Sequence, residues 1–155
     1  MNLIIFGPPG AGKGTQATFI VNKYHLHQLS TGEVLRNEIK NKTELGKKIS
    51  SIINSGTLVS DDIVKKLVEN FISDKRYKNK LIFDGYPRNL TQANTLDELF
   101  KKYGQKLDLV LKLSVSLETV KKRILERQTL EKRTDDDQDI AIKRYETYEK
   151  STEPV

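Results

Sequence analysis

Three short apolar runs divide the chain, and the first two end at glycine and proline. They occupy residues 2–6 (NLIIF), 80–84 within KLIFDGYPR, and 107–115 (LDLVLKLSV). The first run predicts a strand that is buried on both faces, as in a parallel sheet, because it is continuously apolar and of strand length. The other two runs predict further strands of the same sheet.

The segments between these runs carry apolar residues at intervals of three and four positions, which predicts amphipathic helices. The expected helices cover about 13–25, 30–39, 43–56, 60–72, 91–104, 116–128 and 135–150. Ser30 and Glu33 have the spacing of an N-terminal capping box, while Gly56 and Gly104 mark helix ends. Strands that alternate with helices predict an α/β fold with a parallel sheet and right-handed crossovers.

The first strand leads into a glycine-rich segment, FGPPGAGKGTQ, at residues 6–16. Gly7, Gly12 and Lys13 fit the phosphate-loop spacing G-x-x-x-x-G-K-[ST], but Gly14 stands where a hydroxyl residue is expected and Thr15 follows one position later. The backbone N–H groups of such a loop, the positive end of the next helix and the lysine together bind phosphate. The second apolar run ends in Asp84, an acid placed to serve a nucleotide-bound Mg²⁺.

The composition narrows the possible functions. The 155 residues include no cysteine, so we expect neither disulfides nor a cysteine-ligated zinc site, and a reducing cytoplasm suits the chain. No apolar run approaches the roughly 20 residues of a membrane span. The net charge of +6 fits nucleic-acid binding, a pocket for small polyanions or a solvated lysine surface. Most lysines lie in mixed charge runs, which favours the solvated surface for them.

Five blocks of sequence carry a resemblance to a known family: GPPGAGKGTQ, LSTGEVLR, GTLVSDDIV, FDGYPRNLTQA and RTDDDQDIAIKRYETYEKSTEPV. Together they resemble the nucleoside monophosphate kinases, and most closely the adenylate kinases, over the whole chain. The family loop has the form G-K-G-T, so Gly14 is normal there. The family reaction moves the terminal phosphoryl group of Mg-ATP to AMP and gives two ADP.

The resemblance implies a P-loop kinase fold, which is a three-layer α/β/α domain with a helical AMP-binding lobe and a short lid. We expect one domain over 1–155, with a core at 1–29, 60–127 and 137–155, the lobe at 30–59 and the lid at 128–136. It also implies a cis peptide bond between Tyr86 and Pro87.

The same resemblance assigns residues to the two nucleotides. For ATP it implies Gly10, Ala11, Gly12, Lys13, Gly14, Thr15, Arg123 and Arg127. For AMP it implies Thr31, Gly32, Arg36, Thr57, Leu58, Val59, Gly85, Tyr86, Arg88, Gln92, Arg133 and Arg144, with Gln92 at the adenine edge. Lys13, Arg88, Arg123, Arg133 and Arg144 would be catalytic, and Asp84 would bind Mg²⁺ through water. We expect Mg²⁺ with ATP, no zinc, no nucleic-acid or membrane partner, and a cytoplasmic monomer.

The expected chemistry needs no general base, because the attacking phosphate oxygen of AMP is already ionised near neutral pH. This suits a chain whose only histidines are His25 and His27. Catalysis would then depend on in-line positioning and on cations that spread the developing charge. Arg123 and Arg127 stand four positions apart, where like charges repel unless a polyphosphate lies between them. From spacing alone, an exposed basic helix face is an equal alternative.

Other functions remain open on the sequence. A UMP/CMP kinase shares the architecture, but it typically has alanine and asparagine at the positions of Thr31 and Gln92. A nucleic-acid-binding module would need aromatic residues for stacking, and the aromatic residues here mostly occupy helix core positions. A catalytically weak nucleotide-binding fragment is the third alternative.

Two features depart from the family pattern. Glu33 stands where the family usually has aspartate. The final STEPV matches a region that precedes a further strand and helix in the family. We therefore expect an unfinished sheet edge, lower stability and weaker ATP binding than in a chain that carries this extension.

Overall fold

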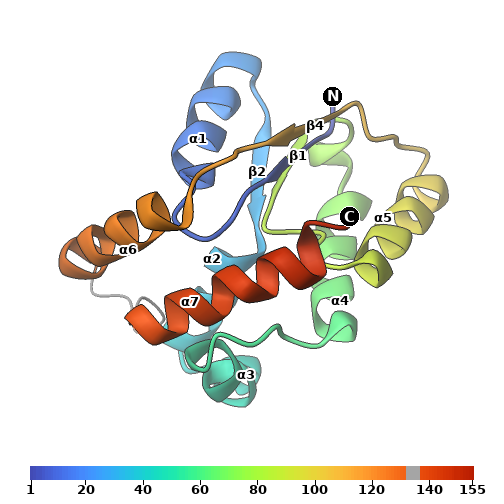
Figure 1. Ribbon diagram of the computed structural model, residues 1–155. Helices are drawn as coiled ribbons and strands as arrows, with labels where there is room; N and C mark the ends of the chain where they lie inside the picture. The colour runs from blue at the N-terminus through green and yellow to red at the C-terminus, as the bar shows by residue number, and fades with distance from the viewer. Residues whose placement is uncertain (132–136) are drawn as a thin grey trace.

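A parallel sheet of four strands forms the centre of the molecule (Figure 1). The structure is a computed structural model, and it describes residues 1–131 and 137–155. The strands are β1 (Leu3–Phe6), β2 (His27–Ser30), β3 (Leu81–Asp84) and β4 (Leu109–Lys112), in the order β2-β3-β1-β4. This arrangement confirms the predicted α/β class with a parallel sheet.

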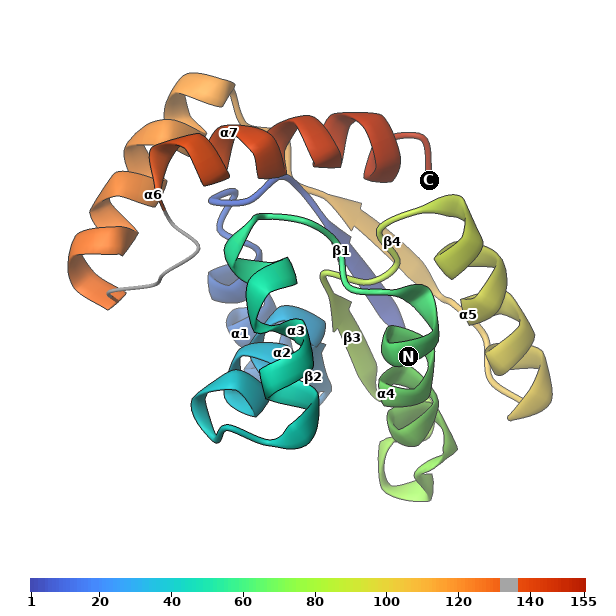
Figure 2. The ribbon, with the colours of Figure 1, turned by 90° about the horizontal axis from the view of Figure 1, so that it is seen from below.

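Helices cover both faces of the sheet (Figure 2). On one face α1 (Lys13–Tyr24) packs Ala17 against Leu3 and Ile5 of β1. On the other face lie α4 (Asp61–Ser73) and α5 (Leu90–Lys102). Buried residues of β3 pack against these helices, and the rings of Phe83 and Phe100 meet edge-to-face with their centroids 5.7 Å apart. Successive residues of β1 thus point into opposite cores, which is why the strand is apolar throughout.

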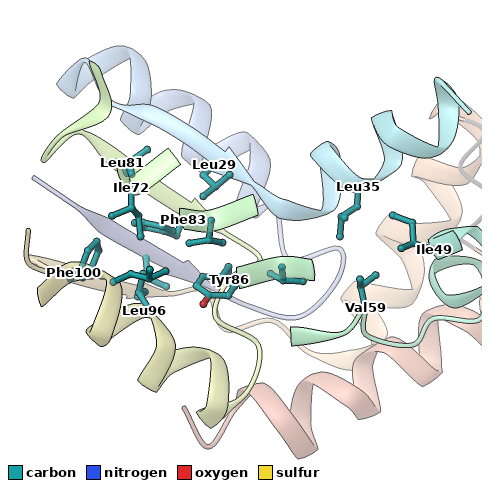
Figure 3. Packing of buried hydrophobic residues seen from close by; sticks show 14 residues of the cluster. Leu29, Leu35, Ile49, Val59, Ile72, Leu81, Phe83, Tyr86, Leu96 and Phe100 are labelled. Atoms are coloured by element: carbon teal, nitrogen blue, oxygen red, sulfur yellow. The ribbon is translucent and has the colours of Figure 1, made fainter. Parts of the chain in front are cut away.

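The larger core continues away from the sheet into a helical pair (Figure 3). This pair consists of α2 (Thr31–Lys40) and α3 (Glu44–Asn54), and Leu35, Ile49 and Val59 are buried between the helices and the chain that follows them. Ser30 caps α2 by accepting a bond from the Glu33 N–H, as the predicted capping box requires. The position of this pair agrees with a helical lobe at 30–59, whose independence as a lobe stays a prediction.

The last part of the described chain returns across one end of the sheet. It comprises α6 (Leu117–Glu131), α7 (Gln138–Thr147) and a terminal turn, η2 (Tyr148–Thr152). The one other short helical turn in the described residues, η1 (Lys75–Tyr77), precedes β3. Figures 1 and 2 both show α7 crossing the end at which β1 finishes. Thr152 donates a hydrogen bond of 2.8 Å to the carbonyl of Arg88, and Lys112 pairs with Glu153.

The edge strand β4 is the least buried strand of the sheet. It pairs with β1 alone among the described strands, and Leu109 and Val110 are each 47% exposed. The sequence predicted a strand here, and the structure confirms it over a shorter range than 107–115. No helix in the described ranges is both long and apolar enough to cross a lipid bilayer.

One strand is missing from the sequence-based prediction. β2 precedes α2, in a segment where the apolar pattern gave only the start of a helix. Its four residues include a single fully buried side chain, Leu29, and the strand forms because it pairs with β3.

Candidate nucleotide-binding site

The glycine-rich loop lies between β1 and α1 and curls tightly against α6. Gly10 has a φ of +77°, a left-handed conformation that favours glycine, and a Cβ there would lie 3.1 Å from Cγ1 of Ile124. The Ala11 N–H donates to the carbonyl of Pro8 at 3.1 Å and closes the turn. The loop conformation therefore follows from both its glycines and the helix that packs behind it.

The N-terminus of α1 opens from this loop as an anion site. Its N-cap residue, Gly12, provides no side-chain cap, and the first turn contains no acid. The first N–H groups of a helix have no partner within the helix, so they are available to phosphate oxygens. Gly14 and Thr15 lie in this turn and are exposed.

Lys13 holds its ammonium group inside the loop. Its Nζ donates to the carbonyls of Gly7 at 2.7 Å and Pro8 at 3.0 Å. Burial lowers the pKa of Lys13 to about 8; the nearby Asp84 carboxylate opposes this shift, while Arg88, Arg144 and Arg127 add to it. Three arginine charges therefore act on the buried ammonium group together with the Asp84 carboxylate, and such a group of cations suits a polyphosphate.

Asp84 ends β3 beside the loop. The residue is only 8% exposed, lies opposite Ile5 of β1, and accepts a hydrogen bond of 3.1 Å from the Gln28 amide. Among the residues that the structure describes, no group of three or more His, Cys, Asp or Glu side chains is arranged to hold a metal ion. A single carboxylate at this place suits an ion that is held mainly by nucleotide phosphates and water.

A cavity of about 1000 Å³, including its open mouth, joins the loop to the helical pair. Gly7 and Lys13 lie at one wall, and ten of the predicted AMP residues line other parts of the cavity. The latter are Thr31, Gly32, Arg36, Thr57, Leu58, Val59, Gly85, Arg88, Gln92 and Arg144. The cavity combines an apolar lining with several cations, as small-molecule sites do.

The segment that follows β3 supplies a polar, hydrogen-bonded wall of this cavity. The carbonyl of Gly85 accepts two hydrogen bonds, one from Arg88 Nε at 2.7 Å and one from the Thr31 hydroxyl at 2.8 Å. The Arg88 N–H donates to Gln92 Oε1 at 2.7 Å. These bonds fix the arginine at the carboxyl end of β3, where ligands of parallel sheets bind.

Tyr86 takes a different place from its predicted neighbours. It is 1% exposed, and its hydroxyl donates 3.0 Å to the carbonyl of Gln92 (Figure 3). Burial raises the pKa of this phenol. Tyr86 therefore supports the cavity wall from behind, and the Tyr86–Pro87 bond is cis, as the resemblance implies.

The remaining predicted arginines approach from the C-terminal part of the chain. Arg123 donates to the carbonyl of Ala11 at 3.2 Å, and Arg127, one turn later, is close enough to lower the pKa of Lys13. Arg123 thus contacts the loop directly, and the charge of Arg127 acts on the lysine within it. Arg133 and most of the predicted lid at 128–136 lie outside the described residues.

Several residues in or directly behind the cavity wall were not predicted from the sequence. Asp61 accepts a hydrogen bond of 2.7 Å from the Gln92 amide, while Thr147, Tyr148 and Thr152 line the cavity beside Arg144. The only sequence signal for Asp61 was its position in the first turn of a helix. The hydrogen bond between Asp61 and Gln92 joins residues 31 positions apart, so no local sequence pattern indicates it.

The fold and the loop define a phosphate-loop nucleotide-binding protein of the α/β class. A family model described as adenylate kinase matches residues 5–155. The chain is 42% identical over an alignment length of 181 to an adenylate kinase of Pelagibacter ubique, 40% over a length of 177 to one of Fusobacterium nucleatum, and 43% over a length of 155 to one of Stenotrophomonas maltophilia. All of this chain is covered in each case, together with 85%, 84% and 83% of the relative.

The chain belongs to the adenylate kinase family, which confirms the resemblance drawn from its sequence blocks. It is shorter than these relatives, and the expected loss of stability and of ATP affinity stays a prediction.

Proposed function

We propose that this chain transfers the terminal phosphoryl group of Mg-ATP to AMP and yields two ADP. One observation carries the proposal: a single cavity is lined at one wall by the phosphate loop and at the others by Arg36, Arg88 and Arg144. A reaction between two nucleotides requires phosphate recognition on both sides of the transferred group. Family membership supports the same reaction.

The donor nucleotide would bind on the loop side. The N-terminus of α1 and the ammonium group of Lys13 would hold its phosphates, with Arg123 and Arg127 above the loop. Mg²⁺ would neutralise phosphate charge, and Asp84 is the carboxylate that would hold it through water. These residues fit that ion, because the nucleotide itself supplies most of its oxygen ligands.

The acceptor would bind on the side of α2 and α3. Arg36 and Arg88 are placed for its phosphate, while Thr31, Gln92 and the chain at 57–59 surround the space left for its base. Planar guanidinium groups match phosphate oxygens in pairs, so arginine suits this role better than lysine. Gln92 would contact the adenine edge, which favours AMP over UMP or CMP.

Catalysis would depend on position and charge. His25 and His27 are exposed, and His27 packs against the Tyr77 ring at 4.7 Å, so neither histidine belongs to the cavity. The arginines and Lys13 would stabilise the charge that develops on the transferred group. We further propose that the segment 30–59 closes over the nucleotides, and that the protein is a monomer in the cytoplasm.

A coupled assay with ATP and AMP, UMP, CMP or GMP as the acceptor tests this function. We expect ADP formation with AMP as the preferred acceptor, and a loss of kcat/KM of about 10²–10³-fold in Arg88→Ala. Arg76→Ala is the matched control, because Arg76 is exposed, pairs with Asp74 and lies away from the cavity. Absence of product with all four acceptors would refute the proposal.

A further inference from the structure

The side-chain amide of Gln92 is held at both ends. Its Nε2 donates to Oδ1 of Asp61 at 2.7 Å, and its Oε1 accepts the Arg88 N–H at 2.7 Å. Asp61 is fixed in turn by Asn89, whose Nδ2 donates to it at 3.2 Å and whose Oδ1 accepts the Gln92 N–H at 2.7 Å. The start of α4 is thereby joined to the start of α5 around this one amide.

These partners allow only one orientation of the amide. A carboxylate accepts hydrogen bonds and cannot donate when ionised, and a backbone N–H can only donate. Rotation of the amide by 180° would place its oxygen against Asp61 and its NH₂ group against the Arg88 N–H. Gln92 is only 3% exposed, so water would not compensate for these two mismatches.

The fixed amide still has hydrogen-bonding capacity toward the cavity that it lines. One N–H and one lone pair of Oε1 remain after the bonds to Asp61 and Arg88. Adenine offers a matching edge, with a donor at its 6-amino group and an acceptor at N1. A 6-oxo purine offers the reverse, with an acceptor at O6 and a donor at N1.

We propose that Asp61 is a positioning residue for acceptor specificity: its carboxylate fixes the Gln92 amide in the orientation that selects a 6-amino over a 6-oxo purine monophosphate. The proposal rests on the proposed function, since it assumes that the acceptor base meets Gln92. Asp61 contacts the amide and does not itself need to touch the nucleotide. The specificity of the site then depends on a residue of α4 as well as on α5.

Asp61→Asn tests this assignment with AMP and IMP, which differ in this edge of the base. The asparagine amide introduced by D61N can rotate and donate to the reversed Gln92 amide, so one of the two mismatches that oppose the reversed orientation disappears, and only the mismatch with the Arg88 N–H remains. We expect the ratio of kcat/KM for AMP over IMP to fall roughly tenfold, as one removed hydrogen-bond mismatch would produce. Asp62→Asn is the matched control, because Asp62 is the next residue of the same helical turn and carries the same charge, but its side chain is exposed.

Two further variants separate positioning from a general structural effect. D61E keeps an acceptor-only carboxylate, and we expect it to retain the preference for AMP even where its KM changes. In a Gln92→Leu background, D61N should leave the ratio unchanged, because the amide that it acts on is gone. For any variant that is too slow to assay, titration calorimetry with AMP and IMP gives the corresponding ratio of binding constants. If D61N does not fold, the ratio measured for D61E tests the role of Asp61.

The possible outcomes are distinct. A wild-type chain that neither binds nor phosphorylates AMP refutes the proposed function. A wild-type chain that prefers AMP, together with a D61N variant of unchanged ratio, overturns the role of Asp61 alone. The same conclusion follows if D62N shifts the ratio equally, if D61E loses the preference, or if D61N still shifts the ratio without Gln92.

Discussion

Gly46 marks the closest approach of the two helices that carry the acceptor side of the cavity. It lies in the first turn of α3, and a Cβ added to it would stand 2.0 Å from the carbonyl oxygen and 2.4 Å from the carbonyl carbon of Glu38 in α2. Both atoms belong to the backbone, so no side-chain rotation relieves the collision. Gly46→Ala therefore forces α2 and α3 apart by about 1 Å in a region packed at crystal-like density.

The cost follows from what surrounds this contact. Leu35 and Ile49 are 5% and 0% exposed between the helices, so separation opens a gap beside them. Overpacking of this kind costs about 1–3 kcal/mol, and a rigid backbone obstacle places Gly46→Ala near the upper value. For a chain of this length each kcal/mol lowers Tm by roughly 2–4 °C, so we expect a decrease of roughly 6–12 °C.

The same variant should affect the two substrates unequally. The displaced helices bear Thr31 and Arg36, whereas the phosphate loop belongs to the sheet core. We expect the KM for AMP to rise severalfold with little change in the KM for ATP, as measured by steady-state kinetics beside a calorimetric melt. Gly104→Ala is the control, because a Cβ there meets nothing within 4 Å and its left-handed φ of +60° costs only roughly 1–2 kcal/mol away from the lobe. An unchanged Tm and an unchanged KM for AMP in Gly46→Ala would refute the reasoning.

Three other predictions concern different parts of the molecule. Lys13 has a pKa of about 8 and must be charged to bind phosphate, so the Kd for ATP should rise by up to tenfold per pH unit above pH 8. In Lys13→Arg the Kd should not change over this pH range. Calorimetry in buffers of different ionisation enthalpy would detect the proton that the wild-type protein takes up on binding ATP. Asn2→Leu removes a fully buried amide that accepts a hydrogen bond from the Leu81 N–H and donates one to the Lys106 carbonyl. We expect the free energy of unfolding, measured with urea, to fall by about 2–4 kcal/mol. A decrease below about 1 kcal/mol would contradict the structure. Leu109→Lys on the exposed edge strand should change the free energy of unfolding by less than about 0.5 kcal/mol. It should also reduce aggregation, as measured by light scattering. A large destabilisation would show that this side chain is covered.

Local patterns in the sequence predicted the parts of the fold that depend on local physics. The buried runs of β1 and β3 are apolar because both of their faces are covered. The cap at Ser30 uses a hydroxyl group within the next helical turn, so spacing alone reveals it. β2 has no such signal: His27 is exposed, and the strand depends on pairing with β3.

The site residues differ in the same way: those fixed by local contacts could be predicted from the sequence, and those fixed by distant contacts could not. The phosphate loop is a contiguous segment whose glycine spacing carries its conformation, and the sequence located it. The support of Gln92 by Asp61 spans 31 positions, and the sequence assigned Asp61 only to the favourable end of a helix dipole. Tyr86 stands next to cavity residues in the chain, yet it points into the core because its ring is enclosed by apolar neighbours. Adjacency in sequence therefore predicted the neighbourhood of the site better than it predicted which side chains face the cavity.

The bond from Thr152 to the Arg88 carbonyl has a consequence for the order in which the molecule is built. The two residues are 64 positions apart, so a growing polypeptide can pair β1 with β3 before the segment that contacts Arg88 has been synthesised. The acceptor side of the cavity consequently gains this part of its wall late in synthesis. A nucleotide that bridges the early loop and the late helix would bind only the finished fold, and it would stabilise that fold against its partly assembled precursors.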